Sequence, residues 1–202
     1  MVKKGIFTIG IISFFTIVMV IFSPYGSNAE WGYRCVSTSV AINASAQHAY
    51  EVLGNSENAR KWSTVVHHIP SLNGDQFADG KLGSKRRCFI REDETGKRWD
   101  EEIVIDEFAK KRRLTIYNFV DFPLTTDHLL TEQRYVETSA NECRLTFTLF
   151  LDEEKASWLG ELKLYFAAYQ VEGIFKKNLE NIKHLAEEGD RYQRIYPYAP
   201  LD

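Results

Sequence analysis

The chain has 202 residues, of which 44% are hydrophobic and 26% are charged, as expected for one globular domain with a sizeable core. Its formal net charge of −3 lacks the basic excess of a nucleic-acid-binding protein, which excludes that class. The three cysteines form no C-x-x-C motif or Cys/His cluster, so we expect three small buried side chains or at most one bridge.

Residues Met1–Ala29 have the parts of an export signal and are predicted to lie outside the folded domain. Lys3 and Lys4 precede Gly5–Phe22, which contains no charged residue, and Ser27-Asn28-Ala29 places small residues before a cleavage point. The uncharged stretch is longer than that of most signal peptides and just long enough to span a membrane. Three alternatives stand: a cleaved signal peptide, an anchor retained in the inner membrane, and a buried core helix. The first two place the domain outside the cytoplasm, periplasmic or secreted, because the two lysines hold the N-terminus inside.

The first part of the mature chain predicts a strand and two short helices. Tyr33–Ile42 alternates between apolar and small polar residues, which indicates a half-buried strand. Asn43 or Ser45 can cap a helix over Ala46–Leu53, and a second short helix is predicted over Glu57–Trp62. Six further strands joined by short turns are predicted at Val65–Leu72, Ser84–Arg91, Arg98–Phe108, Arg112–Val120, Asp127–Thr138 and Glu142–Leu151.

The run Ala156–Glu188 is the longest periodic stretch and predicts a long helix with two apolar stripes. The first stripe, expected to close the concave side of the sheet, is Leu164, Ala168, Val171, Phe175, Leu179 and Ile182. The second stripe is Trp158, Leu162, Tyr165, Phe166 and Tyr169. A tyrosine-rich tail, Gly189–Asp202, is predicted to fold back over the second stripe; the alternatives are a frayed tail and a stripe that contacts a protein partner or a membrane.

Several local motifs follow one another in an order that resembles a known superfamily. They are the strand Val36–Ile42 with the helix Ala44–Leu53, the pair Lys61-Trp62, the strand entry Leu82-Gly83-Ser84, the strand at Glu101-Glu102-Ile103, and the ending Leu179–Lys183. Together they resemble the polyketide cyclase/dehydrase-like START superfamily, or SRPBCC proteins, over roughly Tyr33–Glu188. The resemblance implies an α+β helix-grip fold, a curved seven-stranded antiparallel sheet wrapped around a long C-terminal helix with a cavity between them.

The resemblance also implies how the cysteines are arranged. In a helix-grip sheet the first and last strands pair antiparallel, so Cys35 and Cys143 should lie at opposite ends of that pair. Cys88, on the third strand, should lie far from both. We therefore expect no native disulfide.

The sequence contains no G-x-S-x-G, H-E-x-x-H, P-loop or G-x-G-x-x-G motif, and no cofactor is predicted. His67 and His68 are adjacent in a predicted strand and should face opposite sides, which argues against a shared metal site. Glu101 alternates with apolar residues, so it should lie inside or at the rim of the cavity with Arg86 or Arg91 as its partner. It is a weak candidate for a general acid or base; an ion pair or simple exposure are the alternatives.

Aromatic residues make up 13% of the chain, and they either fill the concave side of the sheet or line a pocket there. The candidate ligand-binding residues are Trp62, Ile90, Trp99, Glu101, Ile103, Tyr117, Phe119, Tyr135, Phe147 and Phe175. The first hypothesis is an extracytoplasmic, non-enzymatic protein that binds an apolar small molecule such as a lipid, a quinone or a polyketide-like compound. The alternatives are a cyclase or dehydratase that uses cavity Glu, Tyr and Arg side chains, and an accessory module for an exported enzyme that docks through Trp158, Tyr165 and Tyr169.

Overall fold

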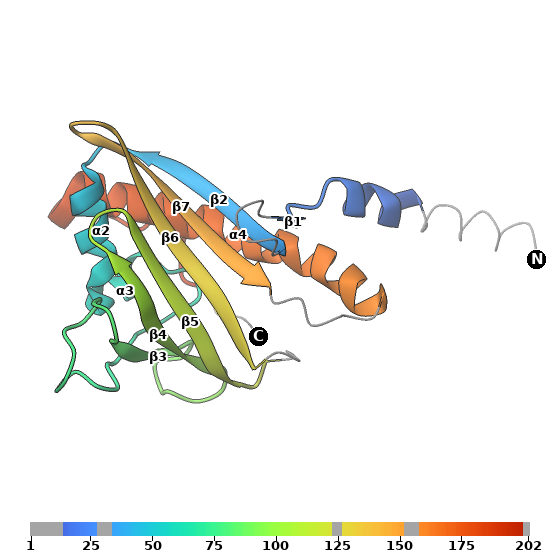
Figure 1. Cartoon of the computed structure of the whole chain (residues 1–202), viewed down its shortest axis with the longest axis horizontal. Coiled ribbons are helices and arrows are strands. Elements are labelled where there is room, and N and C mark those ends of the chain that lie inside the picture. The colour runs from blue at the N-terminus through green and yellow to red at the C-terminus, as the bar shows by residue number, and fades with distance from the viewer. Residues whose placement is uncertain (1–13, 28–33, 123–126, 152–157, 200–202) are drawn as a thin grey trace, which may run out of the picture.

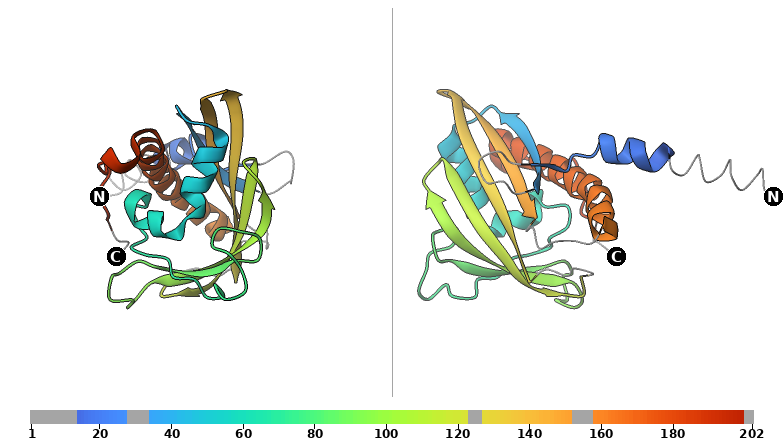
Figure 2. Two further views of the ribbon diagram at one scale, coloured as in Figure 1. Left: turned by 90° about the vertical axis from the view of Figure 1, so that its left-hand side faces the viewer. Right: turned by 45° about the vertical axis from the view of Figure 1, so that its right-hand side comes forward.

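The computed structural model describes residues 14–27, 34–122, 127–151 and 158–199, in which one antiparallel sheet curves around a long helix (Figures 1 and 2). The strands are β1 Gly26–Ser27, β2 Arg34–Ile42, β3 Lys85–Phe89, β4 Arg98–Glu107, β5 Lys111–Val120, β6 His128–Ser139 and β7 Glu142–Leu151. The helices are α2 Ala46–Gly54, α3 Ala59–Trp62 and α4 Trp158–Glu188, with 3-10 turns at Ser56–Asn58 and Gly189–Arg191. Residues 14–21 are also helical and project away from the sheet (Figure 1). Among the described residues, no helix is both long and apolar enough to cross a membrane.

The strand order is β1-β2-β7-β6-β5-β4-β3, so consecutive hairpins account for most of the sheet. β2 and β7 pair antiparallel, as the helix-grip resemblance implies. Their register sets Cys35 opposite Phe150 and Ile42 opposite Cys143, so the two cysteines lie at opposite ends of the pair, as predicted. Cys35, Cys88 and Cys143 are all buried with free thiols.

The described sheet has seven strands, but they are not the seven that the sequence predicts. Six predicted strands are present, whereas Val65–Leu72 makes only two isolated bridges, His68 to Phe89 and Ser71 to Arg86. Pro70 lies between these bridges and has no N–H to give to a ladder, which accounts for the interruption. The seventh strand is β1, which pairs with β2 at the sheet edge although the sequence placed it outside the domain.

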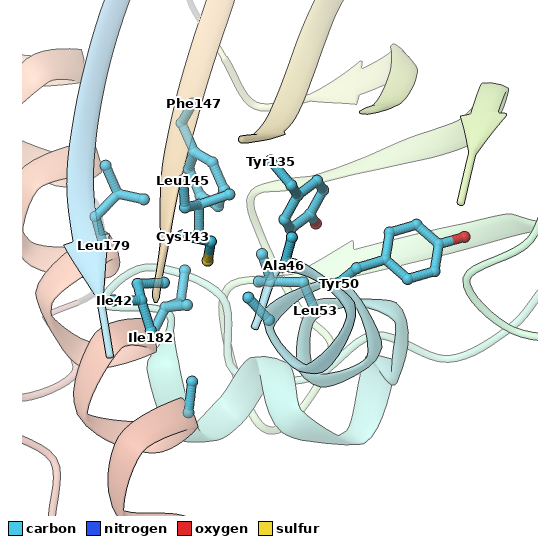
Figure 3. Close-up of a cluster of buried hydrophobic side chains, with 12 residues drawn as sticks. Ile42, Ala46, Tyr50, Leu53, Tyr135, Cys143, Leu145, Phe147, Leu179 and Ile182 are labelled. Atoms are coloured by element: carbon cyan, nitrogen blue, oxygen red, sulfur yellow. The ribbon is translucent and has the colours of Figure 1, made fainter. Parts of the chain in front are cut away.

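The first apolar stripe of α4 faces the sheet, as predicted. Ala168, Leu179 and Ile182 are fully buried, and Leu179 and Ile182 join a core cluster with Ile42 of β2 and Leu145 of β7 (Figure 3). Each such buried aliphatic side chain contributes about 1.5–3 kcal/mol to folding. The C-terminal half of α4 is therefore packed core, and it fixes the helix across the sheet.

Helix α2 closes one end of the core. Ser45 caps it, since its hydroxyl accepts a hydrogen bond of 3.2 Å from the His48 N–H. Ala46, Ala49, Tyr50 and Leu53 follow at helical spacing and are all buried, three of them labelled in Figure 3. The small residues that follow β2 thus lead directly into α2, whose apolar face covers the sheet.

The C-terminal tail packs on the domain, but not where the sequence placed it. Its Ala199 N–H donates to the Thr64 carbonyl at 2.7 Å, and the Tyr196 N–H donates to Asn181 Oδ1 at 2.9 Å. Tyr192 donates to the Lys61 carbonyl at 3.2 Å. The tail therefore covers α3 and the C-terminal half of α4.

The second stripe of α4 is covered from the other end of the chain. Tyr165 packs against Tyr25 with ring centroids 5.0 Å apart, and the Tyr169 hydroxyl donates to the Met19 carbonyl at 2.8 Å. The prediction that these tyrosines lie under the C-terminal tail is therefore wrong. The side chain of Trp158 lies outside the described residues.

Candidate functional site

A cavity of about 360 Å³ lies between the sheet and α4. The predicted wall residues Trp62, Trp99, Glu101, Phe119, Phe147 and Phe175 all line it. The first stripe of α4 contributes Leu164, Ala168 and Val171, and the sheet adds Leu114, Ile116 and Leu149. The volume is at the lower end of the range for small-molecule sites, and most of the lining side chains are apolar.

Four predicted wall residues do not line this cavity. Ile103 and Tyr135 are buried in the surrounding core, and the Tyr135 hydroxyl donates to Gln133, which does line it. Ile90 is also buried, but it follows the last residue of β3, where the chain leaves the sheet. These three residues are therefore buried without lining the cavity.

Tyr117 does not line the cavity because the alternation of side chains along β5 shifts by one residue beside it. Asn118 has a φ of 54°, and the β4–β5 register shifts at this point, which marks a β-bulge. Ile116 and Phe119 both line the cavity, although they are three residues apart. Strict alternation would put Tyr117 and Phe119 on the same face of the strand, but the extra residue leaves only Phe119 on the cavity side.

Arg86, Glu101 and Cys88 form a buried polar cluster at the cavity. The Glu101 carboxylate lies 3.5 Å from Arg86 Nε and accepts a hydrogen bond of 2.7 Å from Cys88 Sγ. Arg86 is 4% exposed and Glu101 8% exposed. The structure thus selects Arg86, not the exposed Arg91, as the partner of Glu101.

Burial and charge set the protonation of this cluster. Burial disfavours the charged form of Arg86, but Glu101 and other nearby groups outweigh it and raise the pKa of the guanidinium above its ordinary value. Burial and the negative charge of Glu101 raise the pKa of Cys88 well above its ordinary value, so the residue is a thiol that can donate. The Glu101 carboxylate therefore has one hydrogen-bond donor, Cys88, and one ion-pair partner, Arg86.

Arg86 also ties the cavity to the turn between α2 and α3. Its Nη1 donates to the Ser56 hydroxyl at 3.2 Å, and Ser56 donates to Asp79 through both its N–H and its hydroxyl at 2.7 Å. Arg86 Nε has no hydrogen-bond partner in the described part of the chain, although it is buried. This atom is closed off by its neighbours, so Arg86 holds Glu101 by charge rather than by a hydrogen bond from Nε.

A second polar cluster stands behind the wall between α2 and the sheet. Arg112 is completely buried, with its guanidinium carbon 4.1 Å from the ring centroid of Tyr50. Arg112 Nη1 donates to Gln133 Oε1 at 3.2 Å, and the Tyr135 hydroxyl donates to the same oxygen at 2.8 Å. Tyr50 in turn donates to Asp106. Gln133 is the member of this cluster that reaches the cavity.

The sequence pattern does not indicate this second cluster. Arg112 follows two lysines and stands at the start of a predicted strand, where an arginine is usually exposed. The available signal was that Arg112 alternates with Leu114 and Ile116, both of which line the cavity.

Glu132 also touches the cavity, but its carboxylate is bonded on both sides. Arg113 Nε lies 3.1 Å from Glu132 Oε2, and Arg134 Nε lies 3.1 Å from Glu132 Oε1. Arg86 and Glu101 are therefore the charged pair best placed to orient a bound molecule.

The histidine pair is arranged differently from the prediction. Because His67 and His68 lie outside a regular strand, their rings meet, with the two Nδ1 atoms 3.1 Å apart. His68 Nε2 lies 3.1 Å from Glu94, on the other side of its ring. Within the ranges that the structure describes, no group of three or more His, Cys, Asp or Glu side chains could hold a metal ion.

The topology, and the cavity between the sheet and α4, define the helix-grip class of small-molecule-binding folds. Residues 33–187 match the family model described as polyketide cyclase/dehydrase and lipid transport, and the chain belongs to that family. No curated protein matches the sequence.

Solved structures with low sequence identity share the fold. A START superfamily protein from Mycobacterium smegmatis has a TM-score of 0.55 and 14% identity, with 75% of this chain and 98% of that chain covered. Norcoclaurine synthase from Thalictrum flavum, in complex with dopamine and hydroxybenzaldehyde, has a TM-score of 0.54 and 12% identity, covering 78% and 88%. DynU16, from the dynemicin biosynthetic locus, has a TM-score of 0.55 and 13% identity, and the match covers 77% of this chain but only 48% of that one.

Proposed function

We propose that this protein binds an apolar small molecule in the cavity under α4, outside the cytoplasm, without transforming it. The observation that carries the proposal is the lining: about 360 Å³ walled mainly by apolar and aromatic side chains, with one buried ion pair. Burial of the ligand surface supplies the affinity, at roughly 25 cal/mol per Å² of apolar area before the costs of ordering are subtracted.

The ion pair supplies orientation. Arg86 and Glu101 both line the cavity, so the guanidinium can donate to a ligand oxygen and the second oxygen of Glu101 can accept from a hydroxyl. This pattern suits an apolar body with a carbonyl, hydroxyl or carboxylate group at one end, as in a fatty acid, a quinone or a polyketide-like compound. Because Glu101 already has Arg86 and Cys88 as partners, the geometry favours binding over proton transfer.

The cavity offers its own spectroscopic reporters. Trp62 and Trp99 both line it, so a fluorescent fatty acid such as parinaric acid should quench tryptophan emission by energy transfer when it binds. Val171→Phe places a larger side chain in the cavity and should weaken binding at least tenfold, with the fold retained by circular dichroism. Gln170→Phe is the matched control, because Gln170 is exposed and does not line the cavity.

Native mass spectrometry identifies the natural ligand. Protein isolated from its own cells should carry an apolar molecule that Val171→Phe protein lacks. The proposal fails if the isolated protein is empty and parinaric acid binds the parent and Val171→Phe variant equally.

A further inference from the structure

The N-terminal segment predicted to lie outside the folded domain is attached to it through Tyr25. Tyr25 is 8% exposed, packs in a cluster with Val36 and Ala168, and stacks edge-on against Tyr165. The Arg34 guanidinium carbon lies 5.2 Å from the Tyr25 ring centroid. A cut after residue 29 would remove this ring and expose apolar surface on both β2 and α4.

The backbone on either side of Tyr25 is also attached. β1 extends the sheet through the pairs Gly26–Cys35 and Ser27–Arg34. The Ser23 hydroxyl donates to the Tyr165 carbonyl at 3.0 Å. Residues 23–27 form an N-terminal clamp, which contacts both the sheet edge and the N-terminal half of α4.

The helix that precedes the clamp presents large apolar side chains to its surroundings. Phe14, Phe15, Ile17, Ile21 and Phe22 are 57–74% exposed. In the sequence the same uncharged run extends back to Gly5, with two lysines before it. An apolar surface of this kind on a soluble protein requires a partner, and a continuous uncharged run of about 18 residues fits hydrocarbon.

We propose that the N-terminal helix stays in the chain and inserts into a lipid bilayer, and that the clamp fixes the domain against that bilayer. The Tyr169 hydroxyl bonds the Met19 carbonyl within this helix, so Tyr165 and Tyr169 lie at the membrane surface, where tyrosine is enriched. The end of the cavity lined by Leu164 and Ala168 is then its membrane-proximal end.

The retention of the helix is tested by mass and fractionation of the full chain. Expressed in a bacterial host and extracted from membranes, the protein should have an intact mass that includes residues 1–29 and should resist carbonate washing. A soluble protein that begins at Glu30, or a full-length protein that leaves membranes in carbonate, would overturn the proposal.

The clamp is tested separately from the helix. Tyr25→Ala should reduce the folding equilibrium constant of the detergent-solubilised full chain at least tenfold, because it opens the cluster with Val36 and Ala168. Phe22→Ala is the control; Phe22 is 74% exposed and should leave stability in detergent unchanged. Equal stability of the two variants would show that the segment is only a tether.

Orientation is tested with brominated phospholipid, which quenches tryptophan inside the bilayer. Phe166→Trp lies on the N-terminal half of α4 and should be quenched in proteoliposomes relative to the parent protein. Lys177→Trp, exposed on the C-terminal half, should not be quenched. Equal quenching at both positions, or at neither, contradicts the orientation proposed.

Discussion

Asp100 shows how one buried carboxylate couples stability to pH. It is 4% exposed and accepts hydrogen bonds from Arg87 Nε at 2.7 Å and Asn118 Nδ2 at 2.8 Å. Burial alone would raise the pKa of Asp100, but these bonds and the Arg87 charge lower it below its ordinary value. The same Asn118 forms the bulge that turns Phe119 into the cavity, so the carboxylate also supports the wall.

Because the pKa of Asp100 is lowered in the folded state, its ionised carboxylate stabilises the fold, and this contribution is lost on acidification. It is fully present above the unfolded-state pKa of about 3.9 and is lost as pH falls through the lower folded-state pKa. Asp100→Asn should therefore cost about 2 kcal/mol at pH 7 and progressively less below about pH 4. Urea titrations at a series of pH values measure this, with the exposed Asp75→Asn as control. A cost independent of pH would contradict the assignment.

At the scale of single elements, α4 is held by buried amides as well as by its apolar stripe. Asn181 is fully buried, and its Nδ2 donates to the carbonyls of Trp62 and Tyr196 at 3.0 Å each. Its Oδ1 accepts from the Tyr196 N–H at 2.9 Å. One side chain therefore joins α3, α4 and the C-terminal tail.

Asn181→Ala should cost about 2–4 kcal/mol of unfolding free energy, because it leaves backbone groups of Trp62 and Tyr196 without partners. The exposed Lys177→Ala on the same helix should change stability by less than about 0.5 kcal/mol. Chemical denaturation compares the two variants, and hydrogen exchange at Tyr196 reports whether the tail detaches. A neutral Asn181→Ala with a protected Tyr196 amide would show that the tail is held by other contacts.

The element order was predictable because it depends on local patterns. Period-two strands, the Ser45 cap and the long stripe of α4 are each written in consecutive residues, and all three are present. The predictions are wrong where a local feature of the backbone, such as a proline or a β-bulge, interrupts a longer pattern. Pro70 interrupts a predicted strand, and the bulge at Asn118 puts Tyr117 and Phe119 on opposite faces of β5.

The candidate site was predicted in part for the same reason. Four of the six wall residues, Trp99, Glu101, Phe119 and Phe147, lie on strands where alternation indicates the facing, whereas Trp62 and Phe175 lie on helices. Alternation left Arg86 and Arg91 as alternative partners of Glu101, and the structure selects Arg86. The Cys88 bond to Glu101 and the Arg112–Gln133 contact join residues of different strands through side-chain geometry, which alternation does not specify. The attachment of β1 depends on long-range pairing with β2, and the export-like composition of the segment argued against it.

At the scale of the whole molecule, segments near both ends of the chain contact α4, the helix that covers the cavity. The N-terminal clamp contacts the first half of α4, and the C-terminal tail contacts its second half and α3. The helix is thereby held across the sheet at two points, while the cavity remains between them. A cavity preserved in the folded state binds ligand only in that state, so ligand and folding are linked.

The linkage gives a quantitative expectation. A ligand at 100 times its Kd should raise the free energy of unfolding by about 2.7 kcal/mol, and Tm by roughly 5–10 °C for a domain of this size. Parinaric acid should produce this shift in the detergent-solubilised full chain, and a change in the guanidinium midpoint at constant m-value should match it. Val171→Phe should lose most of the shift and Gln170→Phe should keep it, because only Val171 lines the cavity. A lower midpoint with parinaric acid would mean that it binds unfolded chains, and the binding role of the cavity would be contradicted.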